Sequence, residues 1–214
     1  MFNNAKAFLF DLNGTMVNDM PYHINAWHKI ITALGANLSI EEVKQECYGK
    51  NDELLERVFP GKYSMDEKLK MGTQKEISYR IDFKPHLQLI EGLDIFLQKA
   101  FEQNIKMAIG SAAMTANIDF VLDNTNTRRY FESIVSADNV LYSKPHPETF
   151  LKCAAALDIA PSECIVFEDT PKGVECAANA GMRAVVIQSG HEKAEFASYT
   201  NVIEFINDYS MLEL

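Results

Sequence analysis

The segment that most constrains this chain is the run Ala7-Phe8-Leu9-Phe10, which is apolar throughout and ends in a carboxylate. A short apolar run bounded by turn residues is typical of a buried strand. The loop that follows reads Asp11-Leu12-Asn13-Gly14-Thr15. Open α/β sheets bind their ligands beyond the carboxyl ends of such strands. The sequence therefore predicts a buried strand that presents Asp11 at a binding edge.

Helical and strand patterns alternate from Glu91 to the later part of the chain. Helices are expected around Leu93 and Ile118, and two further helices are expected to open at Pro147 and Pro171. Strands are expected at 105–109, 131–135, 165–167 and 184–187. Alternating strands and helices predict an α/β fold with a doubly wound, mostly parallel sheet of the Rossmann-like type.

The stretch between the first strand and this alternation is helical throughout. Ile24, Trp27 and Leu34 recur at helical spacing up to Gly35, and Ser39 with Glu42 resembles a capping box. Further helices are expected from Asn51, as an N-cap, and from 64 to 81, where Pro85 closes the block. We therefore expect an α/β core of residues 1–17 and 88–214, interrupted by an all-helical insertion at 18–87. A chain of 214 residues has room for both.

The composition excludes several classes of partner. A net charge of −10 argues against nucleic acid and against an anionic membrane surface, because both carry many negative charges. No apolar run approaches the roughly 18 residues that span a bilayer. The first strand begins too early to leave room for a signal peptide, so a cytoplasmic protein is expected. The four scattered cysteines then correspond to reduced thiols: Cys47, Cys153, Cys164 and Cys176.

Four short groups of polar residues follow predicted strands. They are Asp11 with Asn13, Gly14 and Thr15; Gly110-Ser111-Ala112; Lys144 in Ser143-Lys144-Pro145; and Glu168-Asp169. Each alone has a plainer interpretation: a turn former for Asp11, a helix cap for Ser111, a solvated side chain for Lys144, and a helix N-terminus for the acidic pair. All four plain interpretations holding together, in this order, would be a much rarer event. Their joint occurrence therefore indicates one site.

The order and placing of these groups resemble the four motifs of the haloacid dehalogenase superfamily over essentially the whole chain. The nearest subgroup is the β-phosphoglucomutase-like phosphatases, in which a helical cap is inserted after the first motif. The resemblance implies that Asp11 is a nucleophile that forms an aspartyl-phosphate. It also implies a Mg²⁺ cofactor bound by Asp11, the backbone carbonyl of Asn13, Glu168 and Asp169. The phosphate would be held by Ser111, the N–H of Ala112 and Lys144.

Asn13 departs from the superfamily motif, Asp-x-Asp-Gly-Thr, in which the second Asp exchanges a proton. A carboxamide cannot do so near neutral pH, and such proton transfer is typically worth about 10²–10⁴-fold in rate. Four explanations stay open: another group such as His23 replaces the acid, the enzyme is slow, the protein binds its ligand without turnover, or the residue is engineered. Relatives without this acid carry out non-phosphatase chemistry, and the Asn-Gly pair can deamidate to Asp.

The helical insertion supplies candidate residues for substrate choice. His23 and Trp27 match a His and a Trp of the β-phosphoglucomutase cap, although Trp27 also fits an apolar helix face. Tyr48 and Asp52, around Gly49, stand where the mutase cap carries a Lys and a phosphate-binding Arg. An acidic group opposes a second phosphate. Lys50 and Arg57 are alternative cations at other positions.

The residues and the resemblance together favour a Mg²⁺-dependent phosphohydrolase of a small phosphorylated metabolite. Two alternatives remain: a sugar-phosphate mutase of the β-phosphoglucomutase type, and a phospho-metabolite binder with little turnover. The expected catalytic residues are Asp11, Asn13 and Lys144, with His23, Tyr48 and Gly49 contacting substrate from the cap. The expected assembly is a monomer or a weak homodimer.

Overall fold

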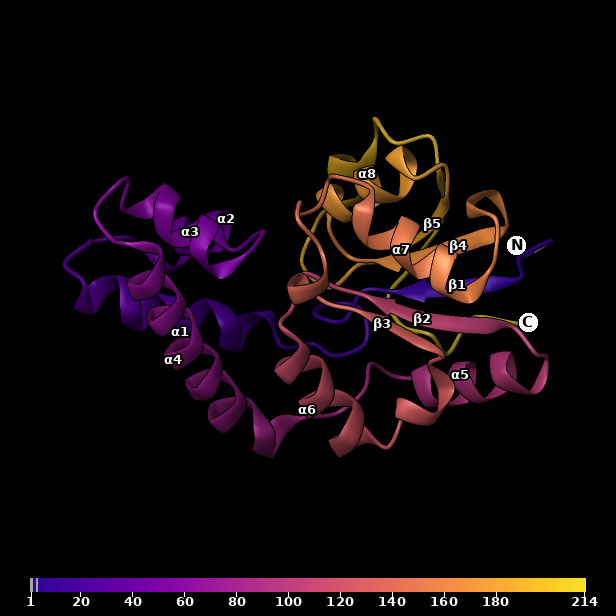
Figure 1. Cartoon of the computed structure of the whole chain (residues 1–214). Helices are drawn as coiled ribbons and strands as arrows, with labels where there is room; N and C mark the ends of the chain where they lie inside the picture. Colours follow the sequence, from indigo (N-terminus) through magenta and orange to yellow (C-terminus); the bar gives the residue numbers. More distant parts are fainter. Residues whose placement is uncertain (1, 3) are drawn as a thin grey trace. The chain divides into compact units, whose positions relative to one another are not determined.

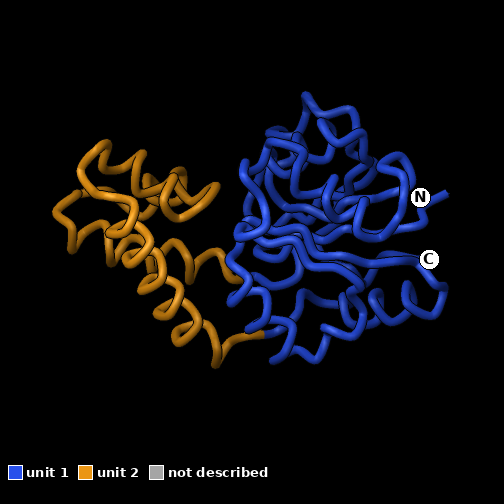
Figure 2. The backbone as a smooth tube through the Cα atoms, viewed as in Figure 1, with its two compact units in different colours: residues 1–18, 88–214 blue, residues 19–87 orange. Residues whose placement is uncertain are grey.

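The computed structural model describes residue 2 and residues 4–214. These residues fall into two compact units, which Figure 2 distinguishes by colour. The first unit contains the chain up to Asn18 and again Gln88–Leu214, and the second contains Asp19–Leu87. Each unit has its own apolar core, with Leu9 in the core of the first and Trp27 in that of the second.

The first unit is built on a six-stranded sheet in which every neighbouring pair is parallel. The strand order is β3-β2-β1-β4-β5-β6, with β1 near the centre. The strands are β1 (Ala7–Phe10), β2 (Lys106–Gly110), β3 (Ser133–Val135), β4 (Cys164–Glu168), β5 (Arg183–Ile187) and β6 (Val202–Ile206). The predicted doubly wound sheet is therefore confirmed. The sequence patterns missed β6, whose residues are mostly half-buried at the sheet edge.

Helices cover both faces of this sheet. Figure 1 shows α5 (Leu93–Glu102) and α6 (Thr115–Thr125) on one face, and α7 (Glu148–Leu157) and α8 (Pro171–Asn179) on the other. Short 3₁₀ helices complete the connections: η2 (Arg128–Tyr130), η3 (Ala137–Asn139), η4 (Pro161–Glu163) and η5 (Lys193–Phe196). Because both faces are covered, the central strands are apolar throughout rather than alternating.

Strand β1 shows how the sequence fills the two layers. Ala7 and Leu9 belong to the apolar core that includes residues of α7 and α8. Phe8 and Phe10 instead contact the ring of Phe167, and the rings of Phe10 and Phe167 are stacked at 4.7 Å. All four β1 side chains are fully buried. The strand that ends at Asp11 is therefore fixed from both sides.

The second unit is entirely helical. It contains α1 (Met20–Ala33), α2 (Ile40–Glu46), α3 (Asn51–Val58), α4 (Met65–Phe83) and η1 (Lys84–His86). The Ser39–Glu42 capping box is present, and Trp27 lies in the core of the unit at 2% exposure. The expected Asn51 cap was wrong, because Asn51 is the first helical residue and its side chain donates to Glu76 at 2.8 Å.

Two predictions about the chain as a whole can be compared with the structure. No helix in the described part of the chain is both long and apolar enough to cross a membrane. The four cysteines are free thiols, and Cys153, Cys164 and Cys176 are buried. Burial raises the pKa of the Cys153 thiol to about 12, which keeps it protonated and unreactive at neutral pH.

Candidate active site

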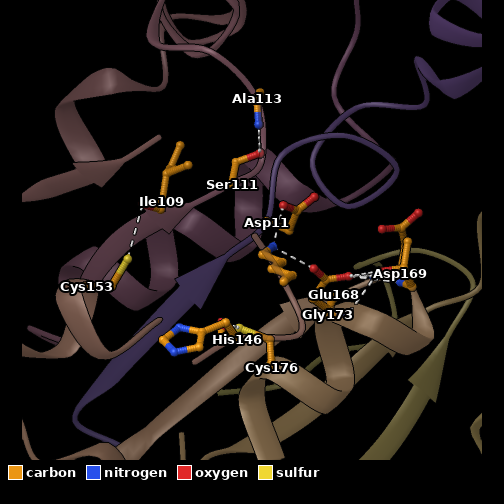
Figure 3. A network of polar contacts seen from close by, with 12 residues as sticks. Asp11, Ile109, Ser111, Ala113, His146, Cys153, Glu168, Asp169, Gly173 and Cys176 are labelled. Carbon is orange, nitrogen blue, oxygen red and sulfur yellow. Dashed lines mark hydrogen bonds and ion pairs between the residues drawn. The ribbon is translucent and has the colours of Figure 1, made fainter. Parts of the chain in front are cut away.

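The structure brings three of the predicted site residues into direct contact at the carboxyl ends of β1 and β4. The Lys144 ammonium donates to Asp11 Oδ1 at 2.8 Å and to Glu168 Oε1 at 2.7 Å. All three side chains are nearly excluded from solvent. Figure 3 shows the carboxylates of Asp11, Glu168 and Asp169 gathered in this one region. The solvated-lysine interpretation of Lys144 is therefore wrong.

Strand pairing explains why Asp11 and Glu168 meet. Phe10 and Phe167 are direct partners in the parallel β1–β4 pair, and the Asp11 N–H donates to the Phe167 carbonyl at 3.0 Å. The next residue of each strand therefore lies at the same edge of the sheet. Strand order reverses between β1 and β4, which is where sheets of this type form a ligand crevice.

The loop that carries Lys144 is held by helix α8. The Cys176 thiol donates to the His146 carbonyl at 3.1 Å, and the Asn179 amide donates to the Pro145 carbonyl at 3.0 Å. The Lys144 ammonium also lies 4.6 Å from the centre of the Phe150 ring. Neither Cys176 nor Asn179 was predicted to support the site, because no pattern in the sequence links a helix to a loop some thirty residues earlier.

Glu168 accepts four hydrogen bonds. Lys144 occupies Oε1, while the Asp169 N–H, the Thr170 N–H and the Thr170 hydroxyl all donate to Oε2 at 2.9–3.0 Å. An ionised carboxylate offers about four lone-pair positions. Three of these hydrogen bonds fix Oε2, and Oε1 faces Lys144, so Glu168 is placed to orient Lys144.

Asp169 is in a different environment from Glu168. Its Oδ2 accepts from the Ser189 hydroxyl at 3.1 Å, and its side chain is 4% exposed. Gly14 lies directly against it, with φ of +73°, and a Cβ added there would be 2.0 Å from Asp169 Oδ2. Only glycine allows this approach, so the first-motif loop and Asp169 are packed together.

A second glycine makes the same kind of contact with Glu168. A Cβ added at Gly173, in the first turn of α8, would lie 1.9 Å from Glu168 Oε1. Sequence patterns did not single out Gly173 or Ser189. A glycine two residues after a helix-opening proline was the available signal for Gly173, because Gly weakens a helix and needs a reason to be there.

The electrostatics of the site follow from burying three carboxylates beside one ammonium. Burial raises the pKa of Asp11 to about 6; Lys144 opposes this rise, and Glu168 adds to it. Burial, with the charges of Glu168 and Asp11, also raises the pKa of Asp169. Burial alone would lower the pKa of Lys144, but the carboxylates of Asp11 and Glu168 outweigh it and raise that pKa. With all four groups ionised, three negative charges face one positive charge and leave a net −2 that favours a divalent cation.

Ser111 also lies at this edge of the sheet, directly after β2. Its hydroxyl forms a hydrogen bond with Asp11 and accepts from the Ala113 N–H at 3.2 Å. Helix α6 begins only at Thr115, so the helix-cap interpretation of Ser111 is wrong. Ala112 lies between Ser111 and Ala113 in the same loop (Figure 3 labels both neighbours). A hydroxyl and backbone N–H groups beside a buried carboxylate form a set of donors suited to an anion.

Asn13 lies in the loop between Asp11 and Gly14 and is half-buried. The Gly14 N–H donates to the Val17 carbonyl at 2.8 Å, and Asn13 forms a bridge with Val17. The Gly14 nitrogen is the atom that would have to attack the Asn13 amide during deamidation. Its hydrogen bond therefore opposes that reaction in the folded protein.

The oxygen donors at this site suit a hard cation such as Mg²⁺. Within residues 2 and 4–214, no cluster of three or more His, Cys, Asp or Glu side chains is arranged for a metal. Mg²⁺ is commonly held by one or two carboxylates together with waters and substrate phosphate. Asp11 and Asp169, with the backbone carbonyl of Asn13, are the oxygen donors that could hold such an ion, and the net negative charge of the site favours a cation.

His23 belongs to a buried polar network of the second unit. Its ring stacks on Tyr79, its Nδ1 lies 2.6 Å from the Lys75 ammonium, and its Nε2 lies 3.5 Å from Asp19 Oδ2. Both ring nitrogens of His23 therefore already have partners within the second unit.

Tyr48 and Gly49 lie in the loop between α2 and α3 of the second unit. The Arg57 guanidinium lies 3.7 Å from the centre of the Tyr48 ring and donates to the Tyr48 carbonyl at 2.8 Å. It also donates to the side chain and the carbonyl of Glu46. Arg57 therefore holds this loop in shape.

Comparison with known proteins places the chain in a family. Residues 8–187 match the haloacid dehalogenase-like hydrolases. An uncharacterized protein of Haemophilus influenzae is 33% identical over 85% of this chain and 90% of its own length. The fructose-1-phosphate phosphatase of Escherichia coli is 26% identical over 88% and 99%, and the β-phosphoglucomutase of Bacillus subtilis is 30% identical over 86% and 84%.

Solved structures agree with these matches. A family IA hydrolase of Entamoeba histolytica superposes with a TM-score of 0.88 at 27% identity, covering 98% of this chain and 96% of the other. The β-phosphoglucomutase of Clostridium difficile gives 0.85 at 25% identity, covering 98% and 94%. The chain therefore belongs to the haloacid dehalogenase-like hydrolases, as an enzyme of their phosphatase or phosphotransferase kind.

Proposed function

We propose that this protein is a Mg²⁺-dependent phosphohydrolase of a small phosphorylated sugar and that its reaction proceeds through an aspartyl-phosphate on Asp11. The observation that carries the proposal is the buried Lys144–Asp11 contact of 2.8 Å beside Asp169. Burial and pairing with Lys144 fix the Asp11 carboxylate at this edge of the sheet. The names of the relatives supply the substrate class, since they include fructose-1-phosphate phosphatase and hexitol phosphatase.

The residues divide the work as follows. An Asp11 oxygen forms a bond to phosphorus while the bond from phosphorus to the sugar oxygen breaks. The sugar oxygen leaves with the bonding electron pair and takes a proton from solvent water. Water then cleaves the acyl-phosphate, which releases phosphate and restores the Asp11 carboxylate. Ser111, the Ala112 N–H and Lys144 hold the phosphoryl oxygens, where negative charge is spread in the transition state. Asp11, Asp169 and the Asn13 carbonyl would hold Mg²⁺, which would supply charge neutralisation there, while Glu168 orients Lys144.

Asn13 limits the rate of both steps. Its carboxamide can hydrogen-bond to the leaving oxygen but cannot give or take a proton. His23 does not fill this role in the proposal, because its Nδ1 lies against Lys75 and its Nε2 against Asp19 within the second unit. The enzyme is therefore expected to be slow with sugar phosphates and faster with phosphates of acidic alcohols, whose leaving groups need no proton.

Hydrolysis is favoured over the mutase reaction by the cap residues. A mutase needs a cation for the phosphate that is not transferred. Asp52 stands at the corresponding place, and Arg57 is already engaged by Glu46 and by Tyr48. Binding a second phosphate would have to break these contacts.

The test is a phosphate-release screen of sugar phosphates and 4-nitrophenyl phosphate, run with Mg²⁺ on the parent and on Asp11→Ala. We expect release by the parent and none by Asp11→Ala, while Asp94→Ala, an exposed carboxylate of α5, stays like the parent. Activity of Asp11→Ala equal to that of the parent would contradict the nucleophile. Conversion of β-glucose 1-phosphate to glucose 6-phosphate, with a bisphosphate requirement, would show the mutase instead.

A further inference from the structure

Two chain segments of the first unit lie side by side where the chain leaves this unit and returns to it. The first is 15–18, which directly follows the Asp11–Gly14 loop, and the second is 88–92. Val17 and Leu89 form an antiparallel bridge, and the Ile90 N–H donates to the Met16 carbonyl at 2.9 Å. We call this pair of segments the crossing. Its first segment, 15–18, continues directly from the loop that carries Asp11.

Tyr209, near the C-terminal end of the chain, bonds to both segments of the crossing. Its hydroxyl donates to the Thr15 carbonyl at 3.0 Å, and its backbone N–H donates to the Glu91 carbonyl at 2.9 Å. The hydroxyl bond joins residues that are 194 positions apart in the sequence. The backbone bond joins the same residue to the second segment. One residue therefore holds the start of the first segment and the end of the second.

The local sequence allows the tail to come this close. Gly92 has φ of +77°, and a Cβ added to it would lie 2.5 Å from the Ser210 nitrogen and 2.8 Å from the Tyr209 carbonyl carbon. A side chain at position 92 would push the tail away from Glu91. The left-handed backbone and the missing Cβ are both needed for this contact.

The hydroxyl of Tyr209 is not explained by packing. Its ring is 1% exposed and packs against three phenylalanines, Phe10, Phe96 and Phe167, at 5.6–6.5 Å between centres. Phenylalanine would fill the same space without burying an oxygen. What the hydroxyl adds is its hydrogen bond to the Thr15 carbonyl. Burial and the charges of Asp169 and Asp11 raise the pKa of Tyr209, so the hydroxyl stays a donor.

The side chain of Thr15 does not anchor the end of the loop. Its Oγ1 is buried and has no hydrogen-bond partner in the described part of the chain. The hydrogen bond from the C-terminal tail to Thr15 is made to its carbonyl. The position of the loop end therefore depends on the backbone and on Tyr209.

We propose that Tyr209 is a positioning residue for the reaction at Asp11, because it locks the Asp11–Thr15 loop to the returning segment at Glu91. The proposal rests on the proposed function for its catalytic consequence. Its structural part is that Tyr209 restricts opening of the loop, and this can be measured without any turnover.

The main experiment compares Tyr209→Phe with the parent and with Tyr199→Phe. The control removes a hydroxyl that bonds to Glu175, away from the crossing. Hydrogen exchange of peptides covering 12–18 and 88–92 is measured together with kcat and KM for 4-nitrophenyl phosphate. Loss of a neutral hydrogen bond predicts exchange and kcat changes of about tenfold in Tyr209→Phe. KM should stay close to the parent value, because the phosphate-binding donors are untouched.

A second variant, Gly92→Ala, should disturb the same contact by displacing the backbone of the C-terminal tail at Tyr209 and Ser210. It should reproduce the local increase in exchange at 12–18. Unchanged exchange in both variants, or a uniform increase across all core peptides with a lowered Tm and no local effect, would overturn the proposal. If Asp11→Ala keeps its activity, the proposed function fails, but the exchange result still decides the role of Tyr209.

Discussion

Lys144 and Asp11 are 133 residues apart in the sequence, yet the Lys144 ammonium donates to Asp11 Oδ1 at 2.8 Å inside the protein. This contact opposes the effect of burial on Asp11. Burial raises the pKa of Asp11, and the charge of Lys144 lowers it. With this contact, the pKa of Asp11 is held at about 6, so that most of the carboxyl is ionised at neutral pH.

Replacing Lys144 with Met should abolish most activity and lower stability at neutral pH. The loss removes a charged donor from the transition state, which is worth about 10²–10³-fold in kcat. It also leaves buried carboxylates without their cation, which costs about 3–5 kcal/mol in the free energy of unfolding. Urea unfolding and phosphate release check both effects, with the exposed Lys152→Met as the matched control. A Lys144→Met enzyme with parental kcat would rule out this role.

Glu168 and Asp169 should differ in their effect on metal affinity. Asp169→Asn removes a proposed ligand, whereas Glu168→Gln disturbs only the orientation of Lys144. Residues behind the ligands typically change metal affinity by about 10–100-fold, so Glu168→Gln should stay within that range and Asp169→Asn should exceed it. Isothermal titration with Mg²⁺, or Mn²⁺ binding followed by EPR, measures both. Equal losses, or a larger loss for Glu168→Gln, would contradict the assignment.

The metal-free protein should lose stability as the pH rises from about 4 to 6. The pKa of Asp11 is 3.8 as a reference and about 6 in the folded state, so the folded state binds more protons across this window and unfolding is favoured by raising the pH. At 1.36 kcal/mol for each pKa unit, Asp11 alone contributes about 3 kcal/mol. Asp11→Asn should flatten this dependence, and Mg²⁺ should restore stability at pH 7. Urea unfolding of the parent and of Asp11→Asn in EDTA, repeated across this pH range, tests the prediction.

Asn13→Asp should raise the rate with sugar phosphates by about 10²–10⁴-fold, because it introduces a side chain that can exchange a proton. The gain should be smaller with 4-nitrophenyl phosphate, whose leaving group needs no protonation. The ratio of the two gains is the informative quantity. Equal gains on both substrates would show that Asn13 acts through something other than proton transfer.

Gly173→Ala should destabilise the protein and reduce activity together. The new Cβ would lie 1.9 Å from Glu168 Oε1, so Glu168 must move and Lys144 loses its second partner. Overpacking of this kind costs about 1–3 kcal/mol. Gly190→Ala is the control, because no atom lies within 4 Å of the added Cβ there. Thermal unfolding and kcat should shift for Gly173→Ala alone.

Much of the first unit was predictable from local patterns. The apolar run 7–10 is typical of a strand with both faces covered, and four later strands were found by the same pattern. Strand β6 was missed although its sequence, Val-Ile-Glu-Phe-Ile, is rich in residues that favour strands; its side chains are mostly half-buried at the sheet edge. The Asn51 cap was predicted from residue type, but the Glu76 carboxylate competes for that side chain across 25 residues.

The sequence by itself determined the α/β sheet, the family and the places of Asp11, Ser111, Lys144 and Glu168-Asp169 at strand ends, because burial and strand periodicity are local properties. Only the tertiary structure decided which oxygens of Glu168 are occupied, why Gly14 and Gly173 carry no side chain, and that Tyr209 reaches Thr15. These facts depend on contacts between residues far apart in the sequence. Their geometry is fixed by packing, which no local pattern encodes.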